Sequence, residues 1–184
     1  DPSLTKCEGF LFPETYYLSK KDDAEKVVVI MLREFKKRYK PEFKTRATEL
    51  GMNVSQVVTL ASLIEKETGQ KSERPLIGGV FHNRLKKGML LQCDPTVIYA
   101  LRVNDQYRGM ITYADLRKES PYNTYVTPGL PPGPIANPGE ESIRAALFPQ
   151  ITDKLYFVSK NDGTHHFSAT LDEHNRAVRQ YQRN

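Results

Sequence analysis

The chain has 184 residues, of which 39% are hydrophobic and 27% charged. This length suits a single domain with a hydrophobic core, and the composition excludes a disordered, collagen-like or repetitive protein. A formal net charge of +5 favours an acidic partner, which on charge alone includes nucleic acid, an anionic membrane surface and an acidic polysaccharide. No apolar run approaches the roughly 20 residues that cross a bilayer.

Basic residues crowd the segment 36–40, but no nucleic-acid motif accompanies them. We interpret them as a solvated helix face and expect no nucleic-acid partner. The chain begins at Asp1-Pro2, without an initiator methionine or a signal-peptide pattern. We therefore expect an excised domain whose export signal or anchor lies outside it.

The first half of the chain is predicted to be an extended, aromatic-rich lead-in followed by helices. Residues 8–18 form the lead-in, where Pro13 argues against a central strand. A helix begins near Asp22 or Asp23 and stops before Pro41. Caps, prolines and terminal glycines predict further helices over residues 53–68, 72–88 and 94–100, with a short one from Thr112.

The second half mixes a long loop, helices and a hairpin. Residues 119–139 are rich in Pro, Gly, Asn, Thr and Tyr, and a loop this long is typical of functional sites. The remaining predicted elements are a helix over 138–148, a hairpin of strands 154–159 and 165–168, and a last helix over 170–181. Many helices with few, late strands indicate an α+β fold, helix-rich and with one small hairpin.

The helix over residues 53–68 places two carboxylates differently. At about 100° per residue, its apolar positions gather on one face, whose centre lies between Leu60 and Ile64. Glu67 lies roughly 40° from that centre and Glu65 roughly 120° away. The spacing therefore predicts Glu67 against the apolar side and Glu65 towards water.

A carboxyl group in apolar surroundings has a raised pKa and can act as a general acid near neutral pH. Cleavage of a glycosidic bond needs such an acid at the leaving oxygen. Periodicity alone does not exclude the plainer interpretation, that Glu65 and Glu67 are ordinary charges at a helix end.

Other kinds of site find little support. His165 and His166 are adjacent on a predicted strand and point to opposite faces, and Ser62 lacks the glycines of a nucleophile elbow. Cys7 and Cys93 lack the spacing of a metal site, which leaves a disulfide between them open. We therefore expect no metal and no cofactor.

Polar and aromatic side chains in and near the long loop suit sugar rings, which bind by stacking and by hydrogen bonds to their hydroxyls. The candidates are Gln92, Asp94, Thr96, Tyr122, Asn123, Thr124 and Tyr125. A structural alternative exists for most of them: Asp94 can cap a helix, and Asn123 suits a turn.

Several stretches, in order along the chain, resemble one known family. They are 8–16 (EGFLFPETY), 61–68 (ASLIEKET), 80–85 (VFHNRL), 91–99 (LQCDPTVIY), 122–125 (YNTY), 129–139 (GLPPGPIANPG) and 155–158 (LYFV), followed by His165, Phe167 and His174-Asn175. Together they resemble the endolytic murein transglycosylase family (MltG, also called YceG-like). The resemblance covers essentially the whole chain.

The resemblance implies a lytic transglycosylase that cleaves the β-1,4 bond from N-acetylmuramic acid to N-acetylglucosamine inside a peptidoglycan strand. Such cleavage leaves 1,6-anhydro ends and limits the length of nascent strands. By the same resemblance, the catalytic acid/base is Glu67. The residues expected in the cleft are Gln92, Asp94, Thr96, Asn123 and Tyr125, with His165 and Glu73.

Members of that family are usually anchored in the cytoplasmic membrane with the catalytic part outside, and they carry a LysM-like region upstream. The resemblance therefore implies that residues 1–184 are the single catalytic domain, without the anchor or the LysM-like region. We expect peptidoglycan strands as substrate and peptidoglycan synthases as partners. Cys93 departs from the family pattern, which has a small polar residue such as Thr there.

Two alternatives stay open. A hydrolytic muramidase would need a second carboxylate, for which Glu73, Asp94 and Asp115 are available. A non-catalytic peptidoglycan-binding module would bind strands whether or not Glu67 is present.

Overall fold

The computed structural model describes residues 7–182. Its α-helices are α1 (Ala24–Arg38), α2 (Pro41–Glu49), α3 (Val54–Glu67), α4 (Arg74–Lys86), α5 (Asp94–Val103), α6 (Glu140–Leu147) and α7 (Leu171–Tyr181). Two short 3-10 turns lie at Lys71–Glu73 and Asp115–Arg117. Strands β1 (Tyr156–Ser159) and β2 (His165–Ser168) pair antiparallel, with Tyr156 opposite Ser168. The predicted α+β class is confirmed.

Helix α2 is the element that the sequence analysis missed. The sequence pattern predicts Pro41 only as the end of the preceding helix, but in the structure Pro41 occupies the first turn of α2. Proline is tolerated there because the N–H groups of the first turn have no partner within the helix. α1 therefore ends at Arg38, Tyr39 and Lys40 form the connection, and the chain turns directly into a second helix.

Smaller differences concern element ends. α5 runs on to Val103 and not only to residue 100, and α6 begins at Glu140 behind Gly139 as its N-cap. β1 begins at Tyr156, two residues after the predicted start. Such shifts are expected, because caps and fraying decide helix and strand ends by local hydrogen bonds.

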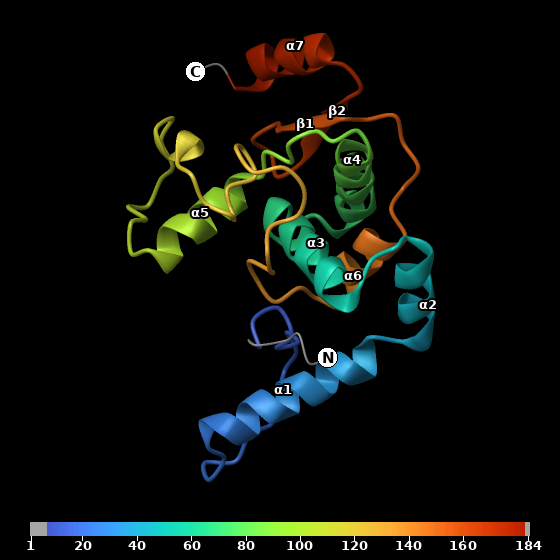
Figure 1. The fold of residues 1–184 in the computed structure, drawn as a ribbon, viewed down its shortest axis with the longest axis vertical. Coiled ribbons are helices and arrows are strands. Elements are labelled where there is room, and N and C mark those ends of the chain that lie inside the picture. The colour runs from blue at the N-terminus through green and yellow to red at the C-terminus, as the bar shows by residue number, and fades with distance from the viewer. Residues whose placement is uncertain (1–6, 183–184) are drawn as a thin grey trace.

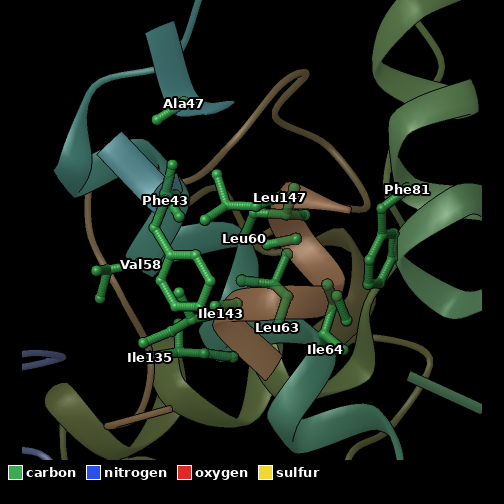
Figure 2. Packing of buried hydrophobic residues seen from close by; sticks show 14 of the residues in the cluster. Phe43, Ala47, Val58, Leu60, Leu63, Ile64, Phe81, Ile135, Ile143 and Leu147 are labelled. Atoms are coloured by element: carbon green, nitrogen blue, oxygen red, sulfur yellow. The ribbon is translucent and has the colours of Figure 1, made fainter. Parts of the chain in front are cut away.

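α3 lies at the centre of the molecule and packs against α6, α4, α5 and α2 (Figure 1). Its residues from Val57 to Ile64 are all buried. Figure 2 shows Leu60 of α3 beside Leu147 of α6, with Leu63 and Ile64 of α3 in the same cluster. Fully burying a side chain of this size contributes about 1.5–3 kcal/mol to the stability of the fold. The buried residues of α3 therefore hold this helix, and the residues at its ends, firmly in place.

The glycine pair of α4 lets that helix approach its neighbours closely. A Cβ atom on Gly78 would lie 2.5 Å from the backbone oxygen of Ala145 in α6, and one on Gly79 would lie 2.4 Å from the oxygen of Gln150. The two glycines therefore serve helix packing.

The hairpin and α7 lie at the end of the molecule opposite α1 (Figure 1). α7 packs on both strands, and Tyr156 stacks on His174 of α7 with 5.2 Å between ring centroids. Across residues 7–182, no helix is long and apolar enough to span a membrane.

Candidate active site

A cleft with a volume of about 390 Å³ lies between the end of α3, the start of α5, the hairpin and α7. Five of the predicted site residues line it: Glu67, Gln92, Asp94, Tyr125 and His165. They come from segments as much as 98 residues apart in the chain, from 67 to 165. Only the fold brings them together.

Glu67 is the last residue of α3 and faces this cleft. Burial raises the pKa of its carboxyl to about 7, the nearby Asp94 carboxylate acts in the same direction, and the Arg84 guanidinium and a hydrogen bond from the Cys93 thiol act against it. The C-terminal end of a helix carries negative partial charge, which also disfavours an ionised carboxylate there. At neutral pH a substantial fraction of Glu67 is therefore protonated.

Cys93 is a buried partner of Glu67. Its side chain is 1% exposed, and burial together with the Glu67 carboxylate raises the pKa of the thiol well above its ordinary value. The thiol is therefore neutral and donates its hydrogen to Glu67. Cys7 is exposed and both cysteines are free, so the disulfide that the sequence left open is absent.

The residue before Cys93 has a strained backbone. Gln92 has φ 49°, in the left-handed region that non-glycine residues seldom adopt. Its N–H donates to the Thr124 carbonyl at 3.0 Å, and the Cys93 N–H donates to the Thr124 hydroxyl at 3.0 Å. These bonds fasten the cleft edge to the long loop and hold a conformation that costs of order 1 kcal/mol or more.

Asp94 and Tyr125 form a pair on the cleft wall. The Tyr125 hydroxyl donates a hydrogen bond to Asp94, and burial and this carboxylate raise the pKa of the tyrosine. Tyr125 therefore stays neutral, and its ring and hydroxyl are held in one orientation towards the cleft.

Glu73 does not line the cleft but holds a residue that does. Its carboxylate accepts hydrogen bonds from the His165 backbone N–H at 2.9 Å and from His165 Nδ1 at 2.7 Å. Thr68, which follows Glu67, donates to the same carboxylate at 3.4 Å. Glu73 thus joins the end of α3 to β2 on the opposite wall, and it leaves Nε2 of His165 as the ring nitrogen available to a ligand.

Thr96 and Asn123 were predicted to bind sugar, and their placement corrects this. Both are buried, at 0% and 1% exposure. The Thr96 hydroxyl donates to the Cys93 carbonyl at 2.7 Å, and the Asn123 amide donates to the Lys118 carbonyl at 2.8 Å while its oxygen accepts from the Tyr125 N–H at 2.9 Å. They support the cleft edge without reaching its surface.

Glu65 was predicted to face water, and this was wrong. It is partly buried and accepts hydrogen bonds from Arg74 at 2.9 Å, from the Gly139 N–H at 3.1 Å and from the Ser142 hydroxyl at 2.7 Å. The periodicity did place it away from the face of Glu67. It could not show that α4 and α6 cover the other side of the helix as well.

Several cleft residues had no assigned role in the sequence analysis. Arg84 donates to the carbonyls of Leu155 and Leu91, at 2.6 and 2.9 Å, and so links α4 to both cleft edges. α7 adds His174 and Val178 to the lining. Arg84 and His174 lie in stretches that carry the family resemblance, and this resemblance was the one signal in the sequence that could have marked them as site residues. Nothing in the local pattern of α7 shows that it borders a cleft.

Across residues 7–182, no three His, Cys, Asp or Glu side chains are grouped as metal ligands would be. The cleft contains instead one carboxyl with a pKa near 7, a second carboxylate held by a tyrosine, a buried guanidinium and two histidines. This set suits proton transfer to and from a neutral, hydroxyl-rich ligand.

The comparisons with known proteins agree with one another. The model of the YceG-like family matches residues 2–180. A protein of Bacillus subtilis (strain 168) named endolytic murein transglycosylase is 44% identical over 175 residues, which are 95% of this chain and 48% of that protein. A protein of the same name from Streptococcus pneumoniae serotype 2 is 32% identical over 179 residues, which are 96% of this chain and 32% of that protein.

A crystal structure of a YceG-like protein from Listeria monocytogenes superposes with a TM-score of 0.81 at 42% identity. The match covers 92% of this chain and 54% of that one. This chain therefore spans about half, or less, of the length of these relatives.

Proposed function

This chain belongs to the YceG-like family, and from that membership and the chemistry of its cleft we propose that it cuts peptidoglycan glycan strands as an endolytic transglycosylase, with Glu67 as the acid/base. The observation that carries the proposal is a carboxyl with a pKa of about 7 facing a cleft lined by hydrogen-bonding and aromatic side chains. A group that is partly protonated at neutral pH can give up a proton and take one back in the same reaction cycle.

The proposed reaction uses one carboxyl twice. Glu67 donates its proton to the glycosidic oxygen while positive charge develops at C1 of the muramic acid residue. The bond from C1 to that oxygen breaks, and the N-acetylglucosamine residue leaves with the proton. The C6 hydroxyl of the same muramic acid then attacks C1, and Glu67 takes the hydroxyl proton. The product is a 1,6-anhydro ring, and no water is consumed.

A tethered nucleophile explains why one carboxyl is enough. The C6 hydroxyl is part of the reacting sugar, so it is present at a very high effective concentration. The Asp94 carboxylate in the same cleft keeps negative charge near the developing positive charge at C1. The hydrogen bond from the Tyr125 hydroxyl holds the Asp94 carboxylate in place on the cleft wall.

Asp94 also favours the second candidate function, a hydrolytic muramidase. A hydrolase needs a second carboxylate to attack C1 or to activate water, and among the residues that the structure describes Asp94 is the one that lines the cleft with Glu67. The two reactions differ in product mass, because hydrolysis adds one water and anhydro formation adds none.

We further propose that the chain acts outside the cytoplasmic membrane, at the membrane surface and together with peptidoglycan synthases. The support is that relatives sharing most of this chain are named for murein, which is an extracytoplasmic polymer. Cross-linking in cells, with the synthases as the proteins to be detected, tests this association.

The decisive experiment is mass spectrometry of purified glycan strands after incubation with the parent, with Glu67→Gln and with Glu25→Gln, a matched control in the exposed first turn of α1. Anhydro-muramyl products from the parent and the control, and none from Glu67→Gln, are expected. Products that have gained water would indicate the muramidase. Strand binding without products from any of the three proteins would contradict both enzymes and indicate a binding module.

A further inference from the structure

A second hollow, with a volume of about 320 Å³, lies against α5 and the loop before α6. Two cationic side chains, Lys66 and Arg102, line it together with the apolar side chains of Pro95, Ile98, Tyr99 and Ile135. Among residues 7–182, none that lines it carries a carboxylate. The function proposed above makes no use of it.

The hollow shares its boundary with the cleft. Lys66 immediately precedes Glu67 at the end of α3, and Pro95 immediately follows Asp94 at the start of α5. Successive residues of a helix point about 100° apart. In each of these neighbouring pairs, one side chain therefore lines the cleft and the other lines the hollow. The last turn of α3 and the first turn of α5 therefore form a narrow ridge between the cleft and the hollow.

The charges of the hollow are available to a ligand. Within the part of the chain that the structure describes, neither Lys66 nor Arg102 forms an ion pair, and both side chains are exposed. Arg102 lies over the Tyr107 ring, 5.0 Å from its centroid. The carboxylate of Glu8 is bound by the Tyr99 hydroxyl at 2.6 Å and is not among the groups that line the hollow.

We propose that this hollow binds the stem peptide of the muramic acid residue whose bond Glu67 cleaves. The proposal rests on the function proposed above. Muramic acid carries its peptide through a lactyl ether on C3, two ring atoms from the C1 that reacts, so the peptide must leave the cleft close to Glu67. The peptide is short, and its alanine residues and the free carboxylates of its glutamate and C-terminus match apolar walls with two unpaired cations, while the amine of its diamino acid would have to stay in solvent.

The test compares two substrates that differ only in the peptide. Glycan strands that keep their stem peptides and strands from which an amidase has removed them are offered to the parent and to the double variant Lys66→Ala/Arg102→Ala. A second double variant, Arg33→Ala/Lys44→Ala, removes the same charge from exposed positions on α1 and α2. For the first variant we expect KM on peptide-bearing strands to rise about five- to tenfold, with kcat unchanged and no change on bare strands.

A binding measurement separates this proposal from the proposed function. Calorimetric titration of Glu67→Gln with a single muramyl peptide, which has no bond to cleave, should show binding that Lys66→Ala/Arg102→Ala weakens and Arg33→Ala/Lys44→Ala does not. An equal loss on both substrates, or no loss on either, would overturn the stem-peptide site. If the parent cleaves neither substrate, the proposed function fails, and the titration alone then shows whether the hollow binds the stem peptide.

Discussion

At the scale of single residues, the protonation of Glu67 links function to stability. The pKa of the folded protein, about 7, lies above the ordinary value of 4.5, so the folded state binds the proton more tightly than the unfolded state. The free energy of unfolding therefore falls as the pH rises from about 4.5 to about 7, by about 3 kcal/mol at most. Below this pH window the Glu67 carboxyl is protonated in both the folded and the unfolded state, so it no longer lowers the free energy of unfolding.

The first prediction concerns this pH window. Glu67→Gln keeps the shape of the protonated carboxyl and cannot ionise, so it should be more stable than the parent by about 3 kcal/mol at pH 8.5 and nearly equal to it at pH 4.5. Urea unfolding at the two pH values measures the difference. A stability difference independent of pH would show that Glu67 is not desolvated as described.

The second prediction concerns the activity profile. A general acid must be protonated in the free enzyme, so kcat/KM should fall about tenfold per pH unit above roughly pH 7. Cys93→Ala removes the thiol that stabilises the Glu67 carboxylate, so the midpoint of this fall should move to higher pH. Cys7→Ala, at an exposed position, is the control. A midpoint that stays in place or moves down would contradict the role of the thiol.

The third prediction concerns Glu73 as a positioning residue. Glu73→Gln has one oxygen for the three donors that the carboxylate accepts, so His165 and Thr68 lose defined partners. We expect kcat/KM to fall about tenfold or more, because a hydrogen bond to a charged group contributes about 1.5–3 kcal/mol. Glu73→Asp should restore part of the activity if the charge is what matters.

Glu173 supplies the matched control for that variant. Its carboxylate also accepts two backbone N–H bonds, from Ala169 and Thr170, but it lies outside the cleft. Glu173→Gln should lower stability with little effect on kcat. Equal losses of kcat in both variants would mean that Glu73 acts only through folding.

At the scale of elements, the two ends of α3 have separate tasks. Its first turn is held by a capping box, in which Asn53 accepts from the Gln56 N–H at 2.9 Å and the Gln56 side chain accepts from the Asn53 N–H at 2.9 Å. Its last residue is Glu67, on the cleft. Stability at one end and chemistry at the other can therefore be changed independently.

The fourth prediction follows from this separation. Asn53→Ala removes the cap and should lower the free energy of unfolding by about 1 kcal/mol, whereas Asn53→Asp should keep most of it. Thermal unfolding measures the loss. The kinetic constants of Asn53→Ala below its melting range should match those of the parent, and a large fall in kcat would show that the two ends are coupled.

At the scale of the whole molecule, the close crossing of α4 and α6 sets the distance between the core and the cleft walls. The fifth prediction tests it: Gly78→Ala would place Cβ 2.5 Å from the Ala145 oxygen, which is backbone and cannot move aside alone. We expect a loss of about 1–3 kcal/mol. Gly69→Ala meets no atom within 4 Å and should change stability by about 0.5 kcal/mol or less. Denaturant unfolding compares the two.

Much of the fold follows from local patterns. The helix containing Glu67, the late hairpin and the capped last helix were all predicted, because caps, strand patterns and the period of a helix act over a few neighbouring residues. α2 was missed because Pro41 is compatible both with the end of one helix and with the start of the next.

Local patterns were therefore enough to predict the fold class and the side of its helix on which Glu67 lies, and to carry the family resemblance. The packing of distant segments was needed to show that Glu73 holds His165, that Thr96 and Asn123 are buried, and that α7 and a cationic hollow border the cleft. The physical reason is distance along the chain. A helix face is set within a few residues, whereas a pair such as Glu73 and His165 is 92 residues apart and meets only after the core around α3 has packed.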